Sequence, residues 1–496
     1  MAGKEGNYTD KEHYEKEPKM RREEDVFGIV ELPVDAYYGI SAQRSKENFP
    51  ITGHKIHPEL MKSLGMVKWA SAKANIQMNK ISKRIGQAIK QASQEMISGK
   101  FDDQFIVDVI HGGAGTPINM NANEIIANRA IELLGGHKGD YDLVSPNTHV
   151  NMAQSTNDVI PTAFKIALIN LNRKLIANLD ELHDALFEKE KEFDDVLKTG
   201  RTHLQDAVPI RLGQEFGAYT RFVSRDIRRI NKAIRELKYI NLGATAVGTG
   251  LNADQMYIEE AKDQLNYISG LELEISEHLV DSTQNMDDYV NLSSTLKTCA
   301  VNLSKMCNDI RLMASGPRCG FGEVSLPVVQ AGSSIMPGKV NPVIAEVVNQ
   351  ISFQVIGNDK TITMAAEAGQ LDLNVMTSVL FHNLFDSLES LTNGVEVLTE
   401  KCIKGMKANK DHCLRLVENS IGIITALNPH IGYEKASEIA MKALKTGRGV
   451  REITIEEGVL SQEEVNRILH PQEMTEPGIA GDVDNDGTAS LYFDKK

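Results

Sequence analysis

The segment of residues 332–342 carries the side chains best suited to chemistry. It contains Ser333, Ser334, Lys339 and Asn341 among glycines and prolines. Glycine opens backbone conformations that other residues avoid, and proline fixes φ and interrupts a helix, so we expect a shaped loop. The hydroxyl, ammonium and amide groups can all donate hydrogen bonds, which favours an anion as ligand. A plain connection between two helices would also use glycine, proline and serine, so the segment alone leaves both interpretations open.

Three further segments, residues 112–124, 145–158 and 200–206, concentrate polar side chains next to glycine or proline. In the second of them, Ser-Thr-Asn-Asp at 155–158 with Pro161 three residues on is typical of a helix start, where such side chains cap free N–H groups. A helix start is itself a site for anions. The capping and ligand-binding interpretations therefore coexist.

Together the four segments resemble the signatures of the fumarase/aspartase superfamily, in the family's order and at similar separations. The resemblance extends over nearly the whole chain. Members of this superfamily eliminate a group beta to a carboxylate and release fumarate. Residues 37–39, 48–53 and 243–250 are more similar to its aspartate ammonia-lyase branch than to fumarases, as is Ala114, where fumarases usually have serine.

The resemblance implies the reversible removal of ammonia from L-aspartate to give fumarate, with no organic cofactor and no metal ion. Two alternatives remain open. One is a fumarase, which interconverts malate and fumarate, or a relative that accepts another amino acid. The other is a catalytically silent structural or regulatory protein on the same scaffold, against which the complete set of polar site residues speaks.

Taking a proton from the carbon beside a carboxylate places negative charge on that carboxylate in the transition state, and fixed donors in a dry pocket stabilise this charge. The resemblance assigns Ser333 as the general base. Because a serine hydroxyl has no useful basicity unless a positive field holds the alkoxide, we expect residues 338–339 and the loop's backbone N–H groups to supply that field. The resemblance implies that the carboxylate beside the abstracted proton is bound by the hydroxyl groups of Thr116, Ser155, Thr156 and Ser334.

Two further pockets follow from the resemblance. Lys339 and Asn341 suit the second carboxylate, one by charge and one by hydrogen bonding. Asn157, Thr202 and His203 resemble the family's pocket for the departing group. A histidine with polar neighbours is otherwise more often structural, and outside this motif we would prefer that interpretation. With the motif present, we expect Ser333, His203 and Lys339 to be the catalytic residues.

The composition agrees with a large soluble enzyme, and the resemblance implies a small anionic substrate. The formal net charge of −14 at pH 7, without any lysine- or arginine-rich block, argues against nucleic acid or an anionic membrane surface as partner. The substrate must then be captured by a local site. Residues 1–25 hold no apolar run, and no segment approaches the roughly 18 apolar residues of a membrane-spanning helix, so we expect a cytoplasmic protein. The cysteines lack CxxC spacing, which is typical of reduced thiols, and no compact metal-ligand motif is present.

Apolar residues recur at steps of three and four from Phe164 to Phe193, from Phe216 to Leu237 and from Leu292 to Met313. This pattern predicts long helices, whose apolar stripes must pack along their length. We predict a mainly α protein with an N-terminal mixed domain over 1–154, a central long-helix bundle over 155–405 and a small C-terminal helical domain with an acidic tail over 406–496. The resemblance implies the three-domain fumarase/aspartase-like fold and a homotetramer in which three chains build each active site.

One position and one segment depart from the sequence patterns that they resemble. Pro117 stands where relatives commonly have serine, and proline should push the preceding Thr116 toward extended geometry. Residues 482–487 copy the first half of an EF-hand loop, but Phe493 occupies the twelfth position, where a bidentate glutamate is needed. We therefore expect a disordered acidic tail, with weak calcium binding as the alternative.

Overall fold

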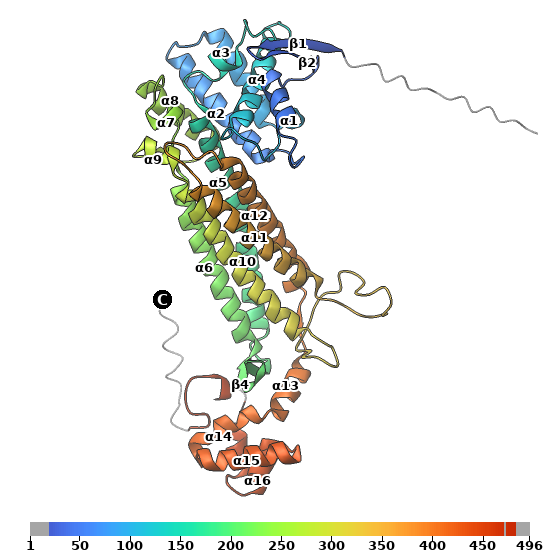
Figure 1. The fold of residues 1–496 in the computed structure, drawn as a ribbon. Coiled ribbons are helices and arrows are strands. Elements are labelled where there is room, and N and C mark those ends of the chain that lie inside the picture. Colours follow the sequence, from blue (N-terminus) through green and yellow to red (C-terminus); the bar gives the residue numbers. More distant parts are fainter. Residues whose placement is uncertain (1–18, 471–472, 483–496) are drawn as a thin grey trace, which may run out of the picture. The chain divides into compact units, whose positions relative to one another are not determined.

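Figure 1 shows a mainly helical protein, in a computed structural model that describes residues 19–470 and 473–482. The predicted fold class is confirmed. The three stretches of apolar periodicity are the helices α5 (Thr156–Glu192), α6 (Leu212–Glu236) and α10 (Asp287–Met313). Two more long helices follow, α11 (Val343–Glu367) and α12 (Thr377–Leu398).

The chain divides into two compact units, and each of the five long helices contributes residues to both. Unit 1 comprises Met1–Asn170, Arg235–Asp288 and Thr361–Phe385, and unit 2 comprises Leu171–Ile234, Tyr289–Lys360 and Asp386–Lys496. The three domains expected from the sequence, with boundaries at 154/155 and 405/406, stay a prediction.

Unit 1 is built around helix α2 (Pro58–Gln77), which packs against α3 (Lys83–Ile97) and α8 (Gln255–Ser269). Its side chains are buried on several faces, from Leu60 and Leu64 to Val67 and Ala74. The remaining elements of unit 1 are the antiparallel hairpin β1 (Met20–Asp25) and β2 (Gly28–Pro33), the parallel pair β5 (Tyr239–Ile240) and β6 (Glu274–Ile275), helices α1 (Ile40–Asn48), α4 (Thr116–Leu133), α7 (Thr245–Gly248) and α9 (Leu279–Gln284), and the short turns η1 (Asp102–Gln104) and η2 (Pro146–Val150).

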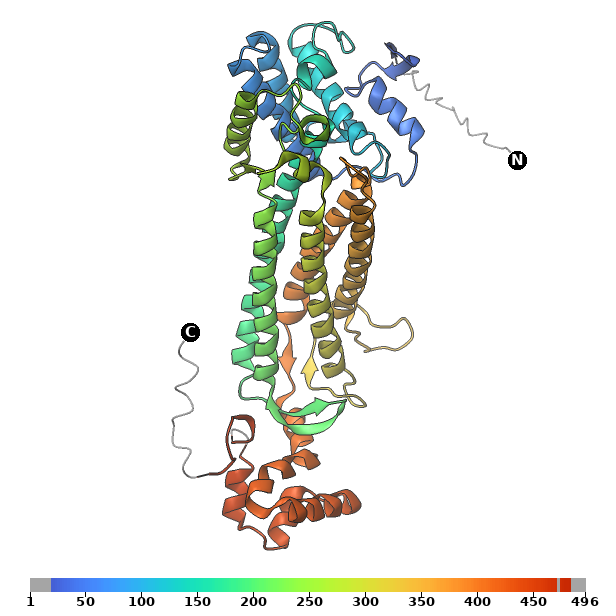
Figure 2. The ribbon, with the colours of Figure 1, turned by 60° about the vertical axis from the view of Figure 1, so that its left-hand side comes forward.

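In unit 2 the segments of the five long helices form a bundle whose members run alongside one another (Figure 2). Buried or half-buried polar side chains join neighbouring helices, which fixes their register because each donor needs its partner. The cross-links run from Asn178 in α5 to the Thr392 carbonyl in α12, from Asn358 in α11 to Asp386 in α12, from Ser293 in α10 to Asp359 in α11, and from Asn302 in α10 to Asp226 in α6.

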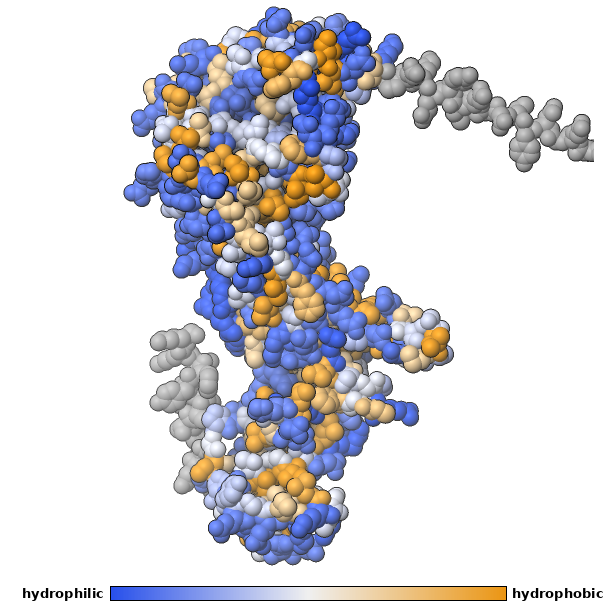
Figure 3. Space-filling view, in the orientation of Figure 1, coloured by the Kyte–Doolittle hydropathy of each residue, from blue (hydrophilic) through white to orange (hydrophobic). Residues whose placement is uncertain are grey.

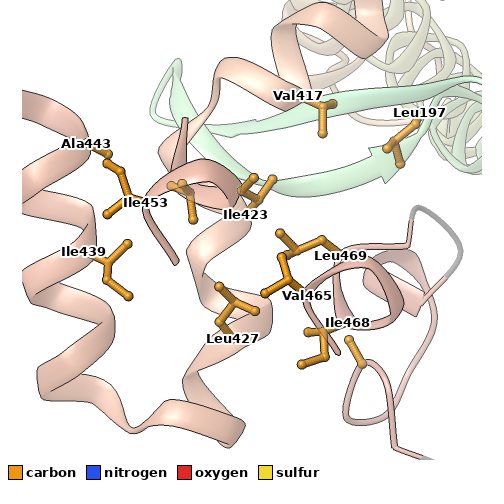
Figure 4. Close-up of a cluster of buried hydrophobic side chains, with 12 residues drawn as sticks. Leu197, Val417, Ile423, Leu427, Ile439, Ala443, Ile453, Val465, Ile468 and Leu469 are labelled. Atoms are coloured by element: carbon orange, nitrogen blue, oxygen red, sulfur yellow. The ribbon is translucent and has the colours of Figure 1, made fainter. Parts of the chain in front are cut away.

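Unit 2 also contains the small C-terminal helices. Figure 4 shows their buried hydrophobic cluster, in which Leu427, Ile439, Val465 and their neighbours lie with Leu197. Leu197 begins strand β3 (Leu197–Thr202), which forms a hairpin with β4 (Gln205–Arg211). The β3–β4 hairpin is thereby anchored to these helices. The elements are β3 (Leu197–Thr202), β4 (Gln205–Arg211), β7 (Val324–Ser325) paired with β8 (Lys407–Ala408), α13 (Lys410–Asn419), α14 (Ile424–Ile431), α15 (Tyr433–Thr446), α16 (Val450–Glu456), α17 (Gln462–Ile468), η3 (Thr399–Ile403), η4 (Ile421–Ile423) and η5 (Glu473–Thr475).

Among the described residues, no helix is both long enough and apolar enough to cross a membrane. The charged N-terminal segment, through residue 18, and the EF-hand-like run from residue 483 onward lie outside the described residues.

The start of α1 is held by a buried carboxylate of α4. Glu124, which is 2% exposed, accepts hydrogen bonds from the backbone N–H groups of Gly39, Ser41 and Ala42 at 2.9, 2.7 and 3.1 Å. Burial raises the pKa of Glu124 to about 7, although these N–H groups favour its charged form. The first N–H groups of a helix have no partner in the helix, so this side chain acts as the cap that α1 lacks locally.

We predict that Glu124→Gln lowers the thermal midpoint of the protein, because the amide nitrogen must face a backbone donor. A buried group left unsatisfied costs about 1–3 kcal/mol. Differential scanning calorimetry measures the change, with Glu31→Gln as the matched control at a half-exposed position that only pairs with exposed Arg22. Equal midpoints for both variants would show that Glu124 does not hold α1.

Candidate active site

The glycine-rich segment before α4 shapes the start of that helix in unit 1. Gly113, Ala114 and Gly115 all have left-handed backbone, with φ of 97°, 52° and 86°. A Cβ on Gly115 would lie 3.0 Å from the Ile160 side chain, so glycine lets α4 begin close against α5. Helix α4 begins at Thr116, whose hydroxyl group is on an exposed residue.

The expectation for Pro117 was wrong. Thr116 is the first residue of α4 and not extended, and Pro117 lies in the first turn. A proline is tolerated there because the N–H groups of the first turn have no partner within the helix. The preceding left-handed glycine brings the chain into the helix in a way that the local preference of a pre-proline residue does not anticipate.

The start of α5 is organised by Asp158. One carboxylate oxygen of this fully buried side chain accepts from the Ser155 N–H at 2.8 Å, and the other accepts from the Gly243 N–H at 2.7 Å. Burial raises the pKa of Asp158 to about 6. Ser155 in turn caps the backbone N–H of Asn157 at 3.3 Å. The capping interpretation is thus correct in detail, while Ser155, Thr156 and Asn157 stay half-buried and accessible to a ligand.

The side chain of Asn157 has a fixed orientation. Its Nδ2 donates to the Ala246 carbonyl at 2.7 Å, so its oxygen is the group left to accept a hydrogen bond. No hydrogen bond to that oxygen occurs among the described residues. The segment of residues 243–250 therefore forms a wall behind Asn157.

The sequence did not predict the role of Asn241, whose side chain supplies a missing hydrogen bond in the first turns of α5. Pro161 lies inside the helix and lacks the N–H that would bond to the Asn157 carbonyl. The Nδ2 of Asn241, which is 2% exposed, donates to that carbonyl at 2.9 Å instead. Pro161 could have pointed to this contact, because a proline inside a helix leaves the carbonyl four residues earlier without its helical donor.

Thr202 and His203 lie at the exposed end of the β3–β4 hairpin in unit 2. The two-residue turn His203–Leu204 has φ of 56° and 60°, the left-handed pair of a type I′ turn, which normally favours asparagine and glycine. Side chains in such a conformation carry strain that proteins tend to keep at functional positions. The His203 imidazole has no hydrogen bond or ion pair within the described part of the chain, which leaves the structural interpretation of this histidine without support.

The base of the hairpin is held by buried charges. The guanidinium of Arg201 and the ammonium of Lys198 both pair with Glu323, which is fully buried, and Lys198 also pairs with Glu215. Breaking one partner of such a network is far more costly than breaking a surface pair. These contacts fix the strands from which Thr202 and His203 project.

The segment of residues 332–342 is the shaped loop that its glycines and prolines predict, and it leads into α11. Its neck is closed by a hydrogen bond from the Gly332 N–H to the Lys339 carbonyl at 3.1 Å and by one from the Asn341 Nδ2 to the Gly332 carbonyl at 2.7 Å. A Cβ at position 332 would lie 2.1 Å from the Lys339 carbonyl oxygen. Only glycine allows this closure.

The hydroxyl group of Ser333 faces backbone donors of its own loop. Its Oγ accepts hydrogen bonds from the backbone N–H groups of Ile335 at 3.2 Å and Met336 at 3.1 Å. Two such donors favour negative charge on that oxygen. The cationic side chain of Lys339, exposed and without an ion pair among the described residues, lies on the same loop. A cleft of about 290 Å³ is lined in part by Gly338, Lys339 and Asn341 of this loop.

The predicted site residues are shared between the two units. Unit 1 holds Thr116, Ser155, Thr156 and Asn157, and unit 2 holds Thr202, His203, Ser333, Ser334, Lys339 and Asn341. The structure brings Ser155, Thr156 and Asn157 together at the start of α5, and Ser333, Lys339 and Asn341 together in one loop. It shows no hydrogen bond or ion pair between the described residues of the hairpin turn and those of the loop.

Comparisons with known proteins match most of the chain. A family model described as "Lyase" matches residues 28–357, and one described as "Fumarase C C-terminus" matches residues 423–476. The chain is similar to the aspartate ammonia-lyase of Bacillus subtilis (56% identity, 93% of this chain and 98% of the relative). It is also similar to that of Escherichia coli (47% identity, 92% and 96%).

Two solved structures are similar as well. A fumarate lyase:delta crystallin from Brucella melitensis bound to cobalt is 46% identical, with a TM-score of 0.90 over 92% of this chain and all of that one. A class II fumarase from Schistosoma mansoni is 34% identical, with a TM-score of 0.89 over 92% of this chain and all of that one.

Proposed function

The chain belongs to the fumarase/aspartase superfamily, and we propose that it catalyses the reversible elimination of ammonia from L-aspartate to give fumarate. The observation that carries this is the 56% identity with an aspartate ammonia-lyase over 93% of this chain and 98% of the relative. Identity with the class II fumarase structure is 34%. The similarity thus favours the ammonia-lyase over the fumarase alternative, as the segments at 37–39, 48–53 and 243–250 do.

The geometry of the 332–342 loop supports Ser333 as the base. As an alkoxide, its Oγ takes a proton from the Cβ of aspartate, and the electron pair of the C–H bond passes to the adjacent carboxylate. The N–H groups of Ile335 and Met336 lower the cost of the alkoxide. When the C–N bond breaks, this electron pair forms the double bond of fumarate and ammonia leaves from Cα.

The start of α5 suits the carboxylate that carries the developing charge. Ser155 and Thr156 present hydroxyl groups at a helix N-terminus, where backbone N–H groups favour an anion. We assign Thr116 and Ser334 to the same carboxylate. Lys339 would pair with the other carboxylate, and Asn341 would donate to it with the amide hydrogen that does not close the loop.

The departing nitrogen requires acceptors. The fixed oxygen of Asn157 and a neutral nitrogen of His203 can both accept from the ammonium group. We place Thr202 next to His203 in this pocket, because it precedes the strained turn that presents the histidine.

Surface hydrophobic residues support a homotetramer in which three chains build each active site. Figure 3 shows such residues among hydrophilic ones on the face drawn. Helix α11 exposes Val347, Phe353 and Met364 at 39, 63 and 60%, and α10 exposes Val301 at 48%. Long helices with exposed apolar side chains indicate burial against other subunits. Residues with acceptor and donor groups that have no partner among the described residues of their own chain, such as His203 and Lys339, would meet there.

The substrate test separates the alternatives. Fumarate with ammonium should yield aspartate, and fumarate alone in water should yield almost no malate, as followed by the ultraviolet absorbance of fumarate and chromatography of the products. Malate formed efficiently without ammonium would replace the proposal by a fumarase. Failure of both reactions in a folded tetramer would favour the alternative of a catalytically silent structural or regulatory protein.

We predict that Ser333→Ala lowers kcat by about a hundredfold or more, since proper general-base action contributes at least that much. Ser334→Ala should lose less, because other hydroxyl groups serve the same carboxylate. Steady-state kinetics with circular dichroism as a folding control measures both. If Ser333→Ala keeps more than about a tenth of the activity, Ser333 is not the base.

The shared active site predicts complementation between inactive variants. His203→Ala and Lys339→Ala should each be inactive, and tetramers re-formed from a dissociated mixture of the two should regain part of the activity, because some sites receive both intact residues. The measurement is activity after reassembly, with each variant reassembled alone as control. Re-formed mixed tetramers without activity would place both residues of a site in one chain.

A further inference from the structure

A buried lysine lies behind the start of α5 in unit 1. Lys68 of α2 is 0% exposed, and its Nζ donates to Asn151 Oδ1 at 3.0 Å and to Gln154 Oε1 at 2.9 Å. Burial lowers the pKa of Lys68 to about 7, while the charge of Asp158 opposes this shift. Among the described residues Lys68 has no ion pair within salt-bridge distance. A buried cation held only by two amide oxygens is costly to keep.

The lysine fixes the orientation of a chain of amides. The Lys68 Nζ donates to Asn151, so Asn151 turns its oxygen toward Lys68. That same oxygen accepts from Asn119 Nδ2 at 3.2 Å and from Asn123 Nδ2 at 3.2 Å. Asn119 therefore faces Asn151 with its nitrogen and not with its oxygen.

The fixed orientation of the Asn119 amide also determines the hydrogen bonding of Thr156, a residue of the candidate active site. Asn119 Nδ2 also donates to the Oγ1 of Thr156, at 3.2 Å. Because this hydroxyl oxygen already accepts from inside the protein, the Thr156 proton is left to be donated to another group. Thr156 is half-buried, at the first position of α5.

We propose that Lys68 is a positioning residue which, through Asn151 and Asn119, directs the Thr156 hydroxyl proton toward the substrate carboxylate. This inference rests on the proposed function, in which Thr156 serves the carboxylate beside the abstracted proton. Lys68 itself does not touch the substrate. Its effect is to make one hydroxyl group a committed donor before substrate binds, which is the preorganisation that stabilises charge in a transition state.

A purely structural role explains the network less well. Within the described part of the chain the Oδ1 atoms of Asn119 and Asn123 are buried without a hydrogen-bond partner, and each such atom costs stability. Lys68 is a fully buried charge, and an apolar residue at position 68 would not bury one. The network therefore lowers the stability of the fold, and it also fixes the direction of the Thr156 hydroxyl group.

A double-mutant cycle on the full-length enzyme tests the inference. Lys68→Met removes the donor at similar size, and Thr156→Val removes the hydroxyl group at similar size. In the otherwise native enzyme, Lys68→Met should lower kcat for aspartate by about a hundredfold, the effect of losing one fixed donor. In the Thr156→Val background the same change should lower kcat by less than about threefold, because the group it directs is absent.

The control is Lys62→Met on the same helix, where the lysine side chain is 42% exposed and kcat should not change. Equal losses of kcat from Lys68→Met in both backgrounds would overturn the inference, since a structural defect does not depend on Thr156. If Lys68→Met does not assemble, Asn119→Leu takes its place in the cycle with the same expectation, because it removes the link next to Thr156. Wild-type activity of Thr156→Val would overturn the inference and leave the proposed function standing, whereas failure of the native enzyme to form aspartate would overturn the proposed function itself.

Discussion

The buried carboxylate of Asp158 is the constraint on which the first half of the candidate site depends. It binds the Ser155 N–H and the Gly243 N–H with its two oxygens, and thereby joins the start of α5 to the segment that follows β5. An unpaired carboxylate in this position would be expensive, so both partners must be in place when the unit folds. Ser155, Thr156 and Asn157 take their positions from this arrangement, and the wall of residues 243–250 takes its position from it too.

The two halves of the chemistry are prepared by different physical means. In unit 1 a helix start with buried side-chain partners offers hydroxyl and amide groups to an anion. In unit 2 a loop closed on Gly332 turns two backbone N–H groups toward one serine oxygen. The first arrangement is rigid because its partners are buried, and the second is rigid because only glycine permits its neck. Both place donors before any substrate is present, which lowers the reorganisation needed during reaction.

Several charged side chains are buried in this fold and hold neighbouring elements in place. Lys68, Glu124 and Glu323 are all buried, and each is bonded to backbone or side-chain groups of another element. Such groups specify one arrangement because no other arrangement satisfies them. In this chain they hold α1, the start of α5 and the β3–β4 hairpin, the last two of which carry candidate site residues.

The sequence by itself determined the long helices, because apolar residues at steps of three and four must face a common core, and Phe164 to Phe193 therefore became α5. It also determined the glycine-shaped loop at 332–342 and predicted a set of residues for binding a dicarboxylate, since motif chemistry is local. The helical geometry of Thr116, the carbonyl of Asn157 served by Asn241, and the amide chain from Lys68 to Thr156 were decided only by tertiary structure. Each of these depends on groups that are far apart in the chain and meet when buried polar atoms seek partners, and no local pattern encodes which distant partner will be found.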